Sequence, residues 1–238
     1  MVDIKSNVGI KSNIKIGILV LSALLWIPAA FAQSNAADPN RGQIVFADDS
    51  AESIKLRSGP GNPVLGKDKS QLCQGCHGED GISFEPLIPS LAGQYGEYIS
   101  KQLRNYQAGT RIHKIMSAMA ATNNDEDLAD ISAYFASRNK MKGKASKNQI
   151  GQNLFLNGDM SRMIVACVNC HGAHGKGKTP TNAVFPVIGG QQHGYLHSQL
   201  INFRKGDRSN SPGGIMNIIC QKLTDAEIEA LADYVSGL

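Results

Sequence analysis

The sequence predicts an all-α protein made of two similar helical domains in tandem. The chain has 238 residues, which is enough for two domains of about 100 residues each. A set of residues in the first half recurs in the same order in the second half, as expected of an internal duplication. Apolar residues recur at helical spacing near the end of both halves, and no alternating pattern of convincing length indicates a strand.

The first 32 residues form a candidate export signal. Three lysines precede an almost wholly apolar run over residues 16–27, and Ala30-Phe31-Ala32 places small residues where a signal peptidase reads them. An uncleaved anchor is the alternative, but the run is shorter than the roughly 20 residues that span a bilayer. We expect a signal peptide over 1–32, cleavage after Ala32 and export to the periplasm.

The charge pattern argues against a nucleic acid partner. Formal net charge is +4, and residues 1–32 contain three Lys and one Asp, so the rest of the chain carries +2. No run of lysine and arginine is interleaved with aromatic residues, as a nucleic-acid surface would require. We therefore expect no nucleic acid partner.

The duplication is clearest around two cysteine motifs. Cys73-Gln-Gly-Cys76-His77 recurs as Cys167-Val-Asn-Cys170-His171 after 94 residues. Further matches follow at offsets of 97 and then 100: residues 89–94 with 186–191, Tyr98 with Tyr195, Gln102 with Gln199, Arg111 with Arg208, Met116 with Met216 and Tyr134 with Tyr234. The predicted domains are 33–139 and 149–238, joined by a linker over 140–148 whose lysines indicate solvent exposure.

The halves are expected to differ upstream of these motifs. Gly42-x-x-x-Phe46 matches Gly151-x-x-x-Phe155 at an offset of 109, which is 15 more than the offset of the cysteine motifs. The surplus falls within residues 48–66, a stretch rich in Gly and Pro. Such composition predicts a tolerated surface loop, with a partner contact as the alternative.

Two helices have clear start signals. Asn124 with Asp127, and Thr224 with Glu227, form capping-box patterns. Apolar residues then share one face of each expected helix: Leu128, Ile131, Tyr134 and Phe135 in the first half, and Ile228, Leu231 and Val235 in the second. Each half is expected to have helices at its start, middle and end.

The Cys-x-x-Cys-His motifs predict covalently attached haem. Two cysteines one helical turn apart can form thioethers with both vinyl groups of a porphyrin, and the adjacent histidine can coordinate the iron. A zinc site would need two further ligands nearby, and a redox dithiol would not need the histidine. The predicted groups are two covalently bound haem c, attached through Cys73, Cys76, Cys167 and Cys170 and coordinated by His77 and His171.

The duplication also selects the second ligand of each iron. Met116 and Met216 occupy equivalent positions far enough after their histidines for the chain to wrap the haem. A thioether favours ferrous iron and raises the reduction potential, which suits electron transfer. Met119 is the nearest competitor, but its counterpart Ile219 cannot ligate. His113 is another alternative, for which a solvent-facing position is favoured.

Other polar residues have competing interpretations. Arg111 and Arg208, with Gln102 and Gln199, are predicted to bind the haem propionates, with simple exposure to solvent as the alternative. His193 and His197 lie four apart, a spacing that can hold a metal. The first half has Gly96 and Ser100 at those places, so a metal site is not favoured. His174 is expected to be exposed.

Cys220 follows Met216 by four residues, where the first half has Ala120. A small, buried, apolar role is favoured over a reactive thiol.

With these motifs in place, the chain resembles the diheme cytochrome c4 family from about Asn40 to Leu238. The shared features are the paired haem motifs, the Pro-x-Leu/Ile-Ala/Gly-Gly-Gln loops, the Gly-x-Arg segments and Met-x-x-x-Ala/Cys. The resemblance implies two class I cytochrome c domains related by pseudo-twofold symmetry, with their haem propionates facing each other. It also implies that Pro89 and Pro186 place their carbonyls against the proximal histidines.

The resemblance implies a periplasmic electron carrier between a redox protein donor and acceptor, toward a terminal oxidase or reductase, with peripheral membrane association. The protein is not expected to be an enzyme, because methionine at both irons leaves no open coordination position. One alternative is the cytochrome subunit of a larger oxidoreductase such as a flavocytochrome c sulfide dehydrogenase. Another is a catalytic diheme enzyme, such as a peroxidase or a thiosulfate dehydrogenase.

Overall fold

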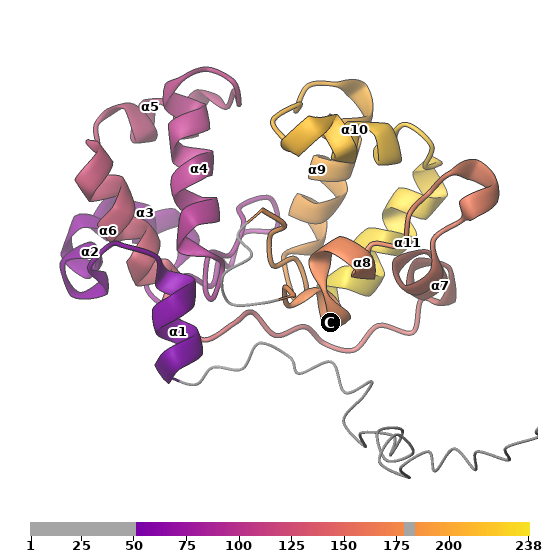
Figure 1. Ribbon diagram of the computed structural model, residues 1–238, viewed down its shortest axis with the longest axis horizontal. Helices are drawn as coiled ribbons and strands as arrows, with labels where there is room; N and C mark the ends of the chain where they lie inside the picture. The colour runs from indigo at the N-terminus through magenta and orange to yellow at the C-terminus, as the bar shows by residue number, and fades with distance from the viewer. Residues whose placement is uncertain (1–50, 179–183) are drawn as a thin grey trace, which may run out of the picture. The chain divides into compact units, whose positions relative to one another are not determined.

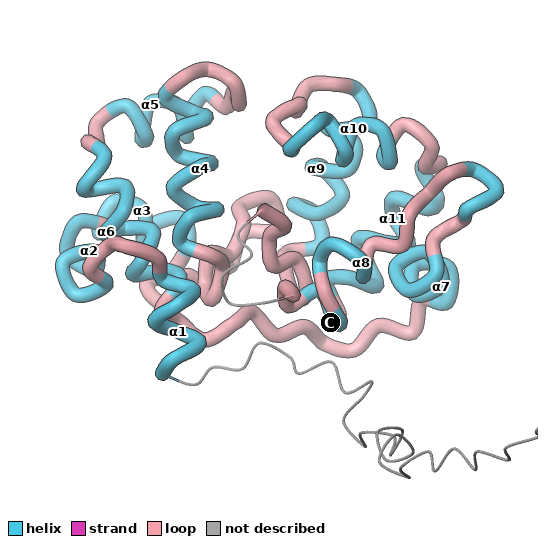
Figure 2. Tube along the Cα trace, in the orientation of Figure 1, coloured by secondary structure: helices cyan, strands magenta, loops and turns pink. Residues whose placement is uncertain are grey.

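The computed structural model describes residues 51–178 and 184–238, all within one compact unit that spans Ile44–Leu238. The predicted signal peptide over 1–32 lies outside the described residues. Within them, helices and loops alternate without a β-strand (Figure 2). The all-α prediction is confirmed. No described helix is long and apolar enough to cross a membrane.

The first half contains α1 (Ala51–Ser58), α2 (Pro63–Lys69), α3 (Gln71–His77), α4 (Gly96–Gln107), α5 (Lys114–Ala121) and α6 (Asp125–Ala136) (Figure 1). The second half contains α7 (Gln149–Asn157), α8 (Val168–His171), α9 (His193–Lys205), α10 (Ile215–Cys220) and α11 (Asp225–Ser236).

The last helix of each half begins at its predicted cap. Asn124 accepts a hydrogen bond from the Asp127 N–H at 2.9 Å, and the Asp127 carboxylate accepts one from the Asn124 N–H at 3.4 Å. Thr224 and Glu227 exchange the same pair of bonds at the start of α11. The apolar residues predicted to share one face of α6 and of α11 are all buried, so each helix packs along its predicted core side.

In the second half, α7 crosses α11 at a glycine. A Cβ added to Gly151 would lie 2.0 Å from the Ala230 carbonyl oxygen and 2.7 Å from the Cβ of Tyr234. Only glycine allows the two backbones to approach this closely. Phe155, one turn later on α7, is fully buried and its ring centroid lies 5.6 Å from that of Tyr234.

The first half has the same crossing between α2 and α6. A Cβ on Gly66 would lie 1.9 Å from the Asp130 carbonyl oxygen and 2.9 Å from the Cβ of Tyr134. Tyr134 is the counterpart of Tyr234, so Gly66 is the counterpart of Gly151. Gly42 lies outside the described residues, and the structure makes Gly66, not Gly42, the counterpart of Gly151.

The predicted surface loop over residues 48–66 is also wrong. Residues 48–50 lie outside the described part, and within 51–66 only residues 59–62 form a turn, between α1 and the first turn of α2. Asn62 caps α2 by accepting from the N–H groups of Val64 and Leu65, and Pro63 occupies the first turn. On α1, Arg57 is buried and its Nε donates to the Ala136 carbonyl at 2.9 Å, so this segment packs against α6.

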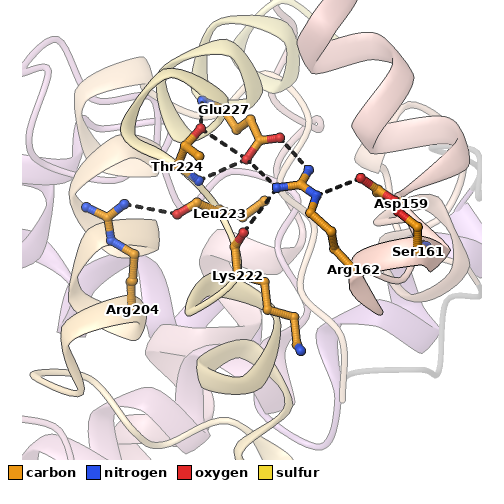
Figure 3. A network of polar contacts seen from close by, with 8 residues as sticks. All are labelled: Asp159, Ser161, Arg162, Arg204, Lys222, Leu223, Thr224 and Glu227. Carbon is orange, nitrogen blue, oxygen red and sulfur yellow. Dashed lines mark hydrogen bonds and ion pairs between the residues drawn. The ribbon is translucent and has the colours of Figure 1, made fainter.

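The additional residues before a cysteine motif belong instead to the second half. They form the loop over 158–167 between α7 and α8, which includes a short 3-10 helix at Met160–Arg162. Arg162 anchors this loop, with its Nε 2.6 Å from the Asp159 carboxylate and its Nη2 2.5 Å from the Glu227 carboxylate (Figure 3). Glu227 also completes the α11 cap with Thr224, so one carboxylate joins the loop to the last helix.

The predicted linker over 140–148 contains no helix, but it is not simply solvated. Lys140 and Met141 are buried. The Gly143 N–H donates to the Leu238 carbonyl at 2.8 Å, and the Ser146 hydroxyl donates to the Asp233 carboxylate at 2.9 Å. The prediction of a solvated linker is wrong for these residues because the segment folds onto the C-terminal end of the chain.

We expect Gly66→Ala and Gly151→Ala each to lower the free energy of unfolding by about 1–3 kcal/mol, because overpacking a tight crossing forces backbone shifts. Urea unfolding of the purified holoprotein measures this change. Gly75→Ala on α3 is the matched control, since nothing lies within 4 Å of an added Cβ there. Wild-type stability in both crossing variants would contradict the proposed packing.

Candidate functional site

One cavity of about 660 Å³ reaches into both halves of the protein. All ten residues predicted to attach haem, coordinate iron or bind propionates line it: Cys73, Cys76, His77, Arg111, Met116, Cys167, Cys170, His171, Arg208 and Met216. The sequence prediction therefore gathered residues that the fold brings together.

The cavity walls are rich in apolar side chains. Leu72, Leu87 and Ile115 line the cavity although they are 77%, 69% and 63% exposed to solvent. A large apolar group in the cavity would remove these surfaces from water. Burial of apolar surface stabilises the folded protein by about 25 cal/mol for each Å². A porphyrin fits these walls.

The two proximal histidines have the same surroundings. His77 ends α3 and its Nδ1 lies 2.7 Å from the Pro89 carbonyl oxygen, and His171 ends α8 with its Nδ1 2.9 Å from the Pro186 carbonyl oxygen. A carbonyl only accepts, so each Nδ1 carries the proton and donates it, which leaves Nε2 free to coordinate a metal. The expected contact of both prolines is confirmed.

Both histidine rings are kept neutral. Burial lowers the pKa of His77 and of His171 below the usual value, against a smaller opposing effect of the proline carbonyls. A neutral imidazole is the form that binds iron.

The motif cysteines lie beside these histidines. Cys73 and Cys76 lie on α3, while Cys167 and Cys170 lie at the start and within α8. Burial raises the pKa of Cys73, and raises that of Cys167 to about 11. None of the five cysteines in the described residues forms a disulfide.

The two methionines lie on short helices and line the same cavity. Met116 lies on α5 and Met216 on α10, and both are partly buried. The Met116 N–H donates to His113 Nδ1 at 3.3 Å, and the Met216 N–H donates to the Ser211 hydroxyl at 3.2 Å. His113 is exposed, as favoured in the sequence analysis, and its side chain caps α5.

Met119 and Ile219 also line the cavity. Because both Met116 and Met119 line the cavity, the structure does not decide which of them coordinates the iron. The preference for Met116 still depends on its equivalence to Met216.

Arg111 and Arg208 are joined across the two halves. Arg111 donates to Gln102 of its own half at 2.8 Å, and to Tyr195 and Gln199 of the other half at 3.0 Å each. The second arginine mirrors this pattern: Arg208 donates to Gln199 at 2.8 Å, to Tyr98 at 3.0 Å and to Gln102 at 3.2 Å. Each glutamine thus bridges both guanidinium groups.

This cluster concentrates positive charge in a buried place. Arg111 and Arg208 are 8% and 7% exposed, and neither forms an ion pair with a carboxylate of the described residues. Burial, and then repulsion from Arg208 and Arg111, lowers the pKa of nearby Lys101. Buried cations need compensating anions, and the carboxylates of haem propionates would supply them.

The remaining candidates have structural roles. His193 Nε2 lies 3.1 Å from Glu229, and His197 Nε2 lies 3.8 Å from the same carboxylate. The structure shows no group of three or more His, Cys, Asp or Glu in the described part of the chain that could hold a metal ion. His174 is exposed, as predicted.

Cys220 is fully buried, and burial raises the pKa of its thiol to about 12. The apolar role predicted for it is confirmed.

The sequence did not predict that four residues connect the two halves at this site. Tyr98 and Tyr195 hold the arginine of the opposite half, and Gln94 and Gln191 also reach across. All four recur at equivalent positions, so the duplication marked them as paired. It could not show that their partners lie in the other half.

Comparison with known proteins identifies the family. The Cytochrome c family model matches residues 64–139 and 149–238, one match in each half. The chain is 38% identical over 186 residues to cytochrome c4 of Pseudomonas aeruginosa, covering 77% of this chain and 92% of that protein. It is 34% identical over 175 residues to the thiosulfate dehydrogenase electron acceptor of Stutzerimonas stutzeri, covering 71% of this chain and 80% of that protein.

A solved structure agrees with the sequence relatives. The crystal structure of reduced recombinant cytochrome c4 from Pseudomonas stutzeri matches with a TM-score of 0.71 and 37% identity, covering 75% of this chain and 99% of that chain. The two haem motifs, the apolar cavity and the buried pair of arginines between the halves fit two covalently bound haem groups. The chain therefore belongs to the diheme cytochrome c4 family of electron-transfer proteins, with two tandem class I cytochrome c domains that bind two covalent haem c groups.

Proposed function

We propose that this protein is a periplasmic electron carrier in which His77 and Met116 coordinate one iron and His171 and Met216 coordinate the other. The observation that carries the proposal is the single cavity that collects all four ligands together with the four motif cysteines. The Nδ1–H bonds to Pro89 and Pro186 leave each histidine one nitrogen for iron.

The chain's own residues would hold and tune the cofactors. Each haem, when bound, supplies a reversible one-electron centre. Cys73 and Cys76 would fix the first haem by thioethers, and Cys167 and Cys170 the second. The methionine sulfurs favour the ferrous state, the apolar walls exclude water, and Arg111 and Arg208 would neutralise the propionates.

We further propose that the protein has no substrate chemistry of its own. His77 and Met116 would hold one iron, and His171 and Met216 would hold the other, which would leave neither iron a place for a substrate, whereas catalysis at an iron needs an open or replaceable position. Six-coordinate iron with fixed ligands changes little on oxidation, which favours electron transfer.

The proposed location and partners follow from the leader and the relatives. The features of residues 1–32 support export and cleavage after Ala32. The similarity to a thiosulfate dehydrogenase electron acceptor supports a carrier that takes electrons from a donor protein and passes them toward a terminal oxidase or reductase. The same similarity also supports a second candidate function, that of a cytochrome subunit in a larger oxidoreductase. The proposal further includes peripheral association with the membrane.

The test is to express the full chain in a bacterium that matures c-type cytochromes and to isolate the protein from its periplasm. We expect an intact mass that begins at Gln33 and includes two haems, and uptake of two electrons per chain. We also expect slow or no turnover of peroxide or thiosulfate, but rapid oxidation of the reduced protein by respiratory membranes. Cytoplasmic retention, or steady turnover of either compound, would contradict the proposal. Stable co-purification with a second redox subunit from the native host would favour the subunit candidate.

A further inference from the structure

Two buried glutamines reach from one half of the protein to the backbone of the other. Gln94 forms hydrogen bonds with both backbone groups of Val187: its Nε2 donates to the Val187 carbonyl at 2.8 Å, and its Oε1 accepts from the Val187 N–H at 2.9 Å. Gln191 bonds to the carbonyl and the N–H of Ser90 in the same way, with both hydrogen bonds at 2.8 Å. Each glutamine is 5% exposed, so water does not compete for these bonds.

Val187 and Ser90 directly follow the two prolines whose carbonyls accept from the proximal histidines. The Val187 N–H and the Pro186 carbonyl belong to one planar peptide group. One end of this group donates to Gln94, and the other end accepts from His171 Nδ1 at 2.9 Å. A glutamine of the first half therefore holds the peptide plane that orients the histidine of the second half.

The reverse connection has the same form. The Ser90 N–H and the Pro89 carbonyl share one peptide plane, whose N–H donates to Gln191 and whose carbonyl accepts from His77 Nδ1 at 2.7 Å. The two contacts are reciprocal, as expected where equivalent surfaces of a duplicated chain meet.

We propose that Gln94 and Gln191 are reciprocal positioning residues, each setting the orientation of the proximal histidine in the opposite half. The ferric-to-ferrous balance of each iron is then fixed partly by the other half. The inference rests on the proposed coordination of iron by His77 and His171.

The physical link is the strength of the histidine hydrogen bond. An imidazole that donates Nδ1–H to a well-placed carbonyl becomes a more basic iron ligand, which favours ferric iron. Donation from the same peptide's N–H to glutamine polarises its carbonyl and strengthens that bond. Removing the glutamine should therefore weaken the bond to the histidine across the interface and shift that iron toward the ferrous state.

The test uses Gln94→Leu and Gln191→Leu in the mature holoprotein, since leucine keeps most of the side-chain volume. Two readouts are measured for each haem: the Nδ1–H resonances of His77 and His171 in reduced, ¹⁵N-histidine-labelled protein, and the ferric-to-ferrous ratio at a fixed electrode potential. We expect Gln94→Leu to shift the His171 resonance and to lower the ratio of the second-half haem about threefold. Gln191→Leu should do the same to His77 and the first-half haem.

Gln192→Ala is the matched control. The Gln192 amide also donates across the interface, to the Ser83 carbonyl, but it does not touch either proline peptide. We expect no crosswise change in this variant. Should a leucine variant fail to fold, Gln94→Asn and Gln191→Asn retain the amide on a shorter side chain and should give the same crosswise pattern at smaller amplitude.

Equal shifts at both haems, a shift confined to the half that carries the substitution, or no shift would each overturn the inference. Failure of the proposed coordination would look different. The unsubstituted protein would then lack two iron-bound histidine resonances, whatever the glutamine variants showed.

Discussion

Replacing Met216 with alanine is expected to remove half of the weak near-infrared absorption that methionine sulfur bound to ferric haem produces. Without the thioether, that iron should bind cyanide or carbon monoxide readily, and its reduction potential should fall by on the order of 100 mV or more, since axial ligands set haem potentials over a wide range. Met116→Ala should produce the same changes in the first half. Optical redox titration measures all three changes.

Met119→Ala is the control for the first half, because Met119 also lines the cavity. It should retain the full near-infrared band and resist cyanide. Loss of half the band in Met119→Ala, with a normal band in Met116→Ala, would exchange the roles of these two residues.

Arg208→Leu, and likewise Arg111→Leu, should have the second largest effect. Each guanidinium is buried among neutral partners and would face the propionates, so its loss should leave a buried anion unpaired and destabilise the holoprotein by about 3–5 kcal/mol. The uncompensated negative charge should also favour ferric iron, which lowers the reduction potential. Denaturant unfolding and redox titration of the same samples test both effects.

Arg104→Leu provides a matched control on the surface. Arg104 lies 2.9 Å from the Asp125 carboxylate with its side chain 51% exposed, and such pairs contribute about 0–1 kcal/mol. If Arg208→Leu and Arg104→Leu cost the same stability and shift neither potential, the buried arginines do not compensate propionates.

The sequence was a good guide where the information is local or duplicated. The caps at Asn124 and Thr224 define the starts of α6 and α11 through neighbouring residues alone. The proposed iron ligands were selected because each half repeats the same residues at nearly the same spacing, and Met116 is preferred to Met119 because the counterpart of Met119 is Ile219.

The sequence was a poor guide to contacts between residues that lie far apart along the chain. The Gly42-x-x-x-Phe46 match involved two residues, whereas the crossing at Gly66 depends on the backbone of a helix more than 60 residues away. The duplication likewise showed that Gln94 and Gln191 are equivalent, but not that each binds the half opposite its own. Contacts between repeated units leave no trace in the spacing of either repeat.

The two halves also differ close to their irons. The helix that carries Met116 is capped by His113, whereas the helix that carries Met216 has no side-chain cap and its Met216 N–H donates to the Ser211 hydroxyl. Cys220 is buried where the first half has Ala120, which is also buried. Two environments with different groups are expected to give two different potentials, so that one haem is reduced before the other.

The most direct test of the central claim is the near-infrared spectrum of the purified, oxidised protein. Two methionine-coordinated irons predict a band with the strength of two such haems, unchanged by cyanide or carbon monoxide at modest concentration. A band with the strength of one haem, or ready binding of either ligand by the unsubstituted protein, would contradict the symmetric coordination and indicate an iron with an open position.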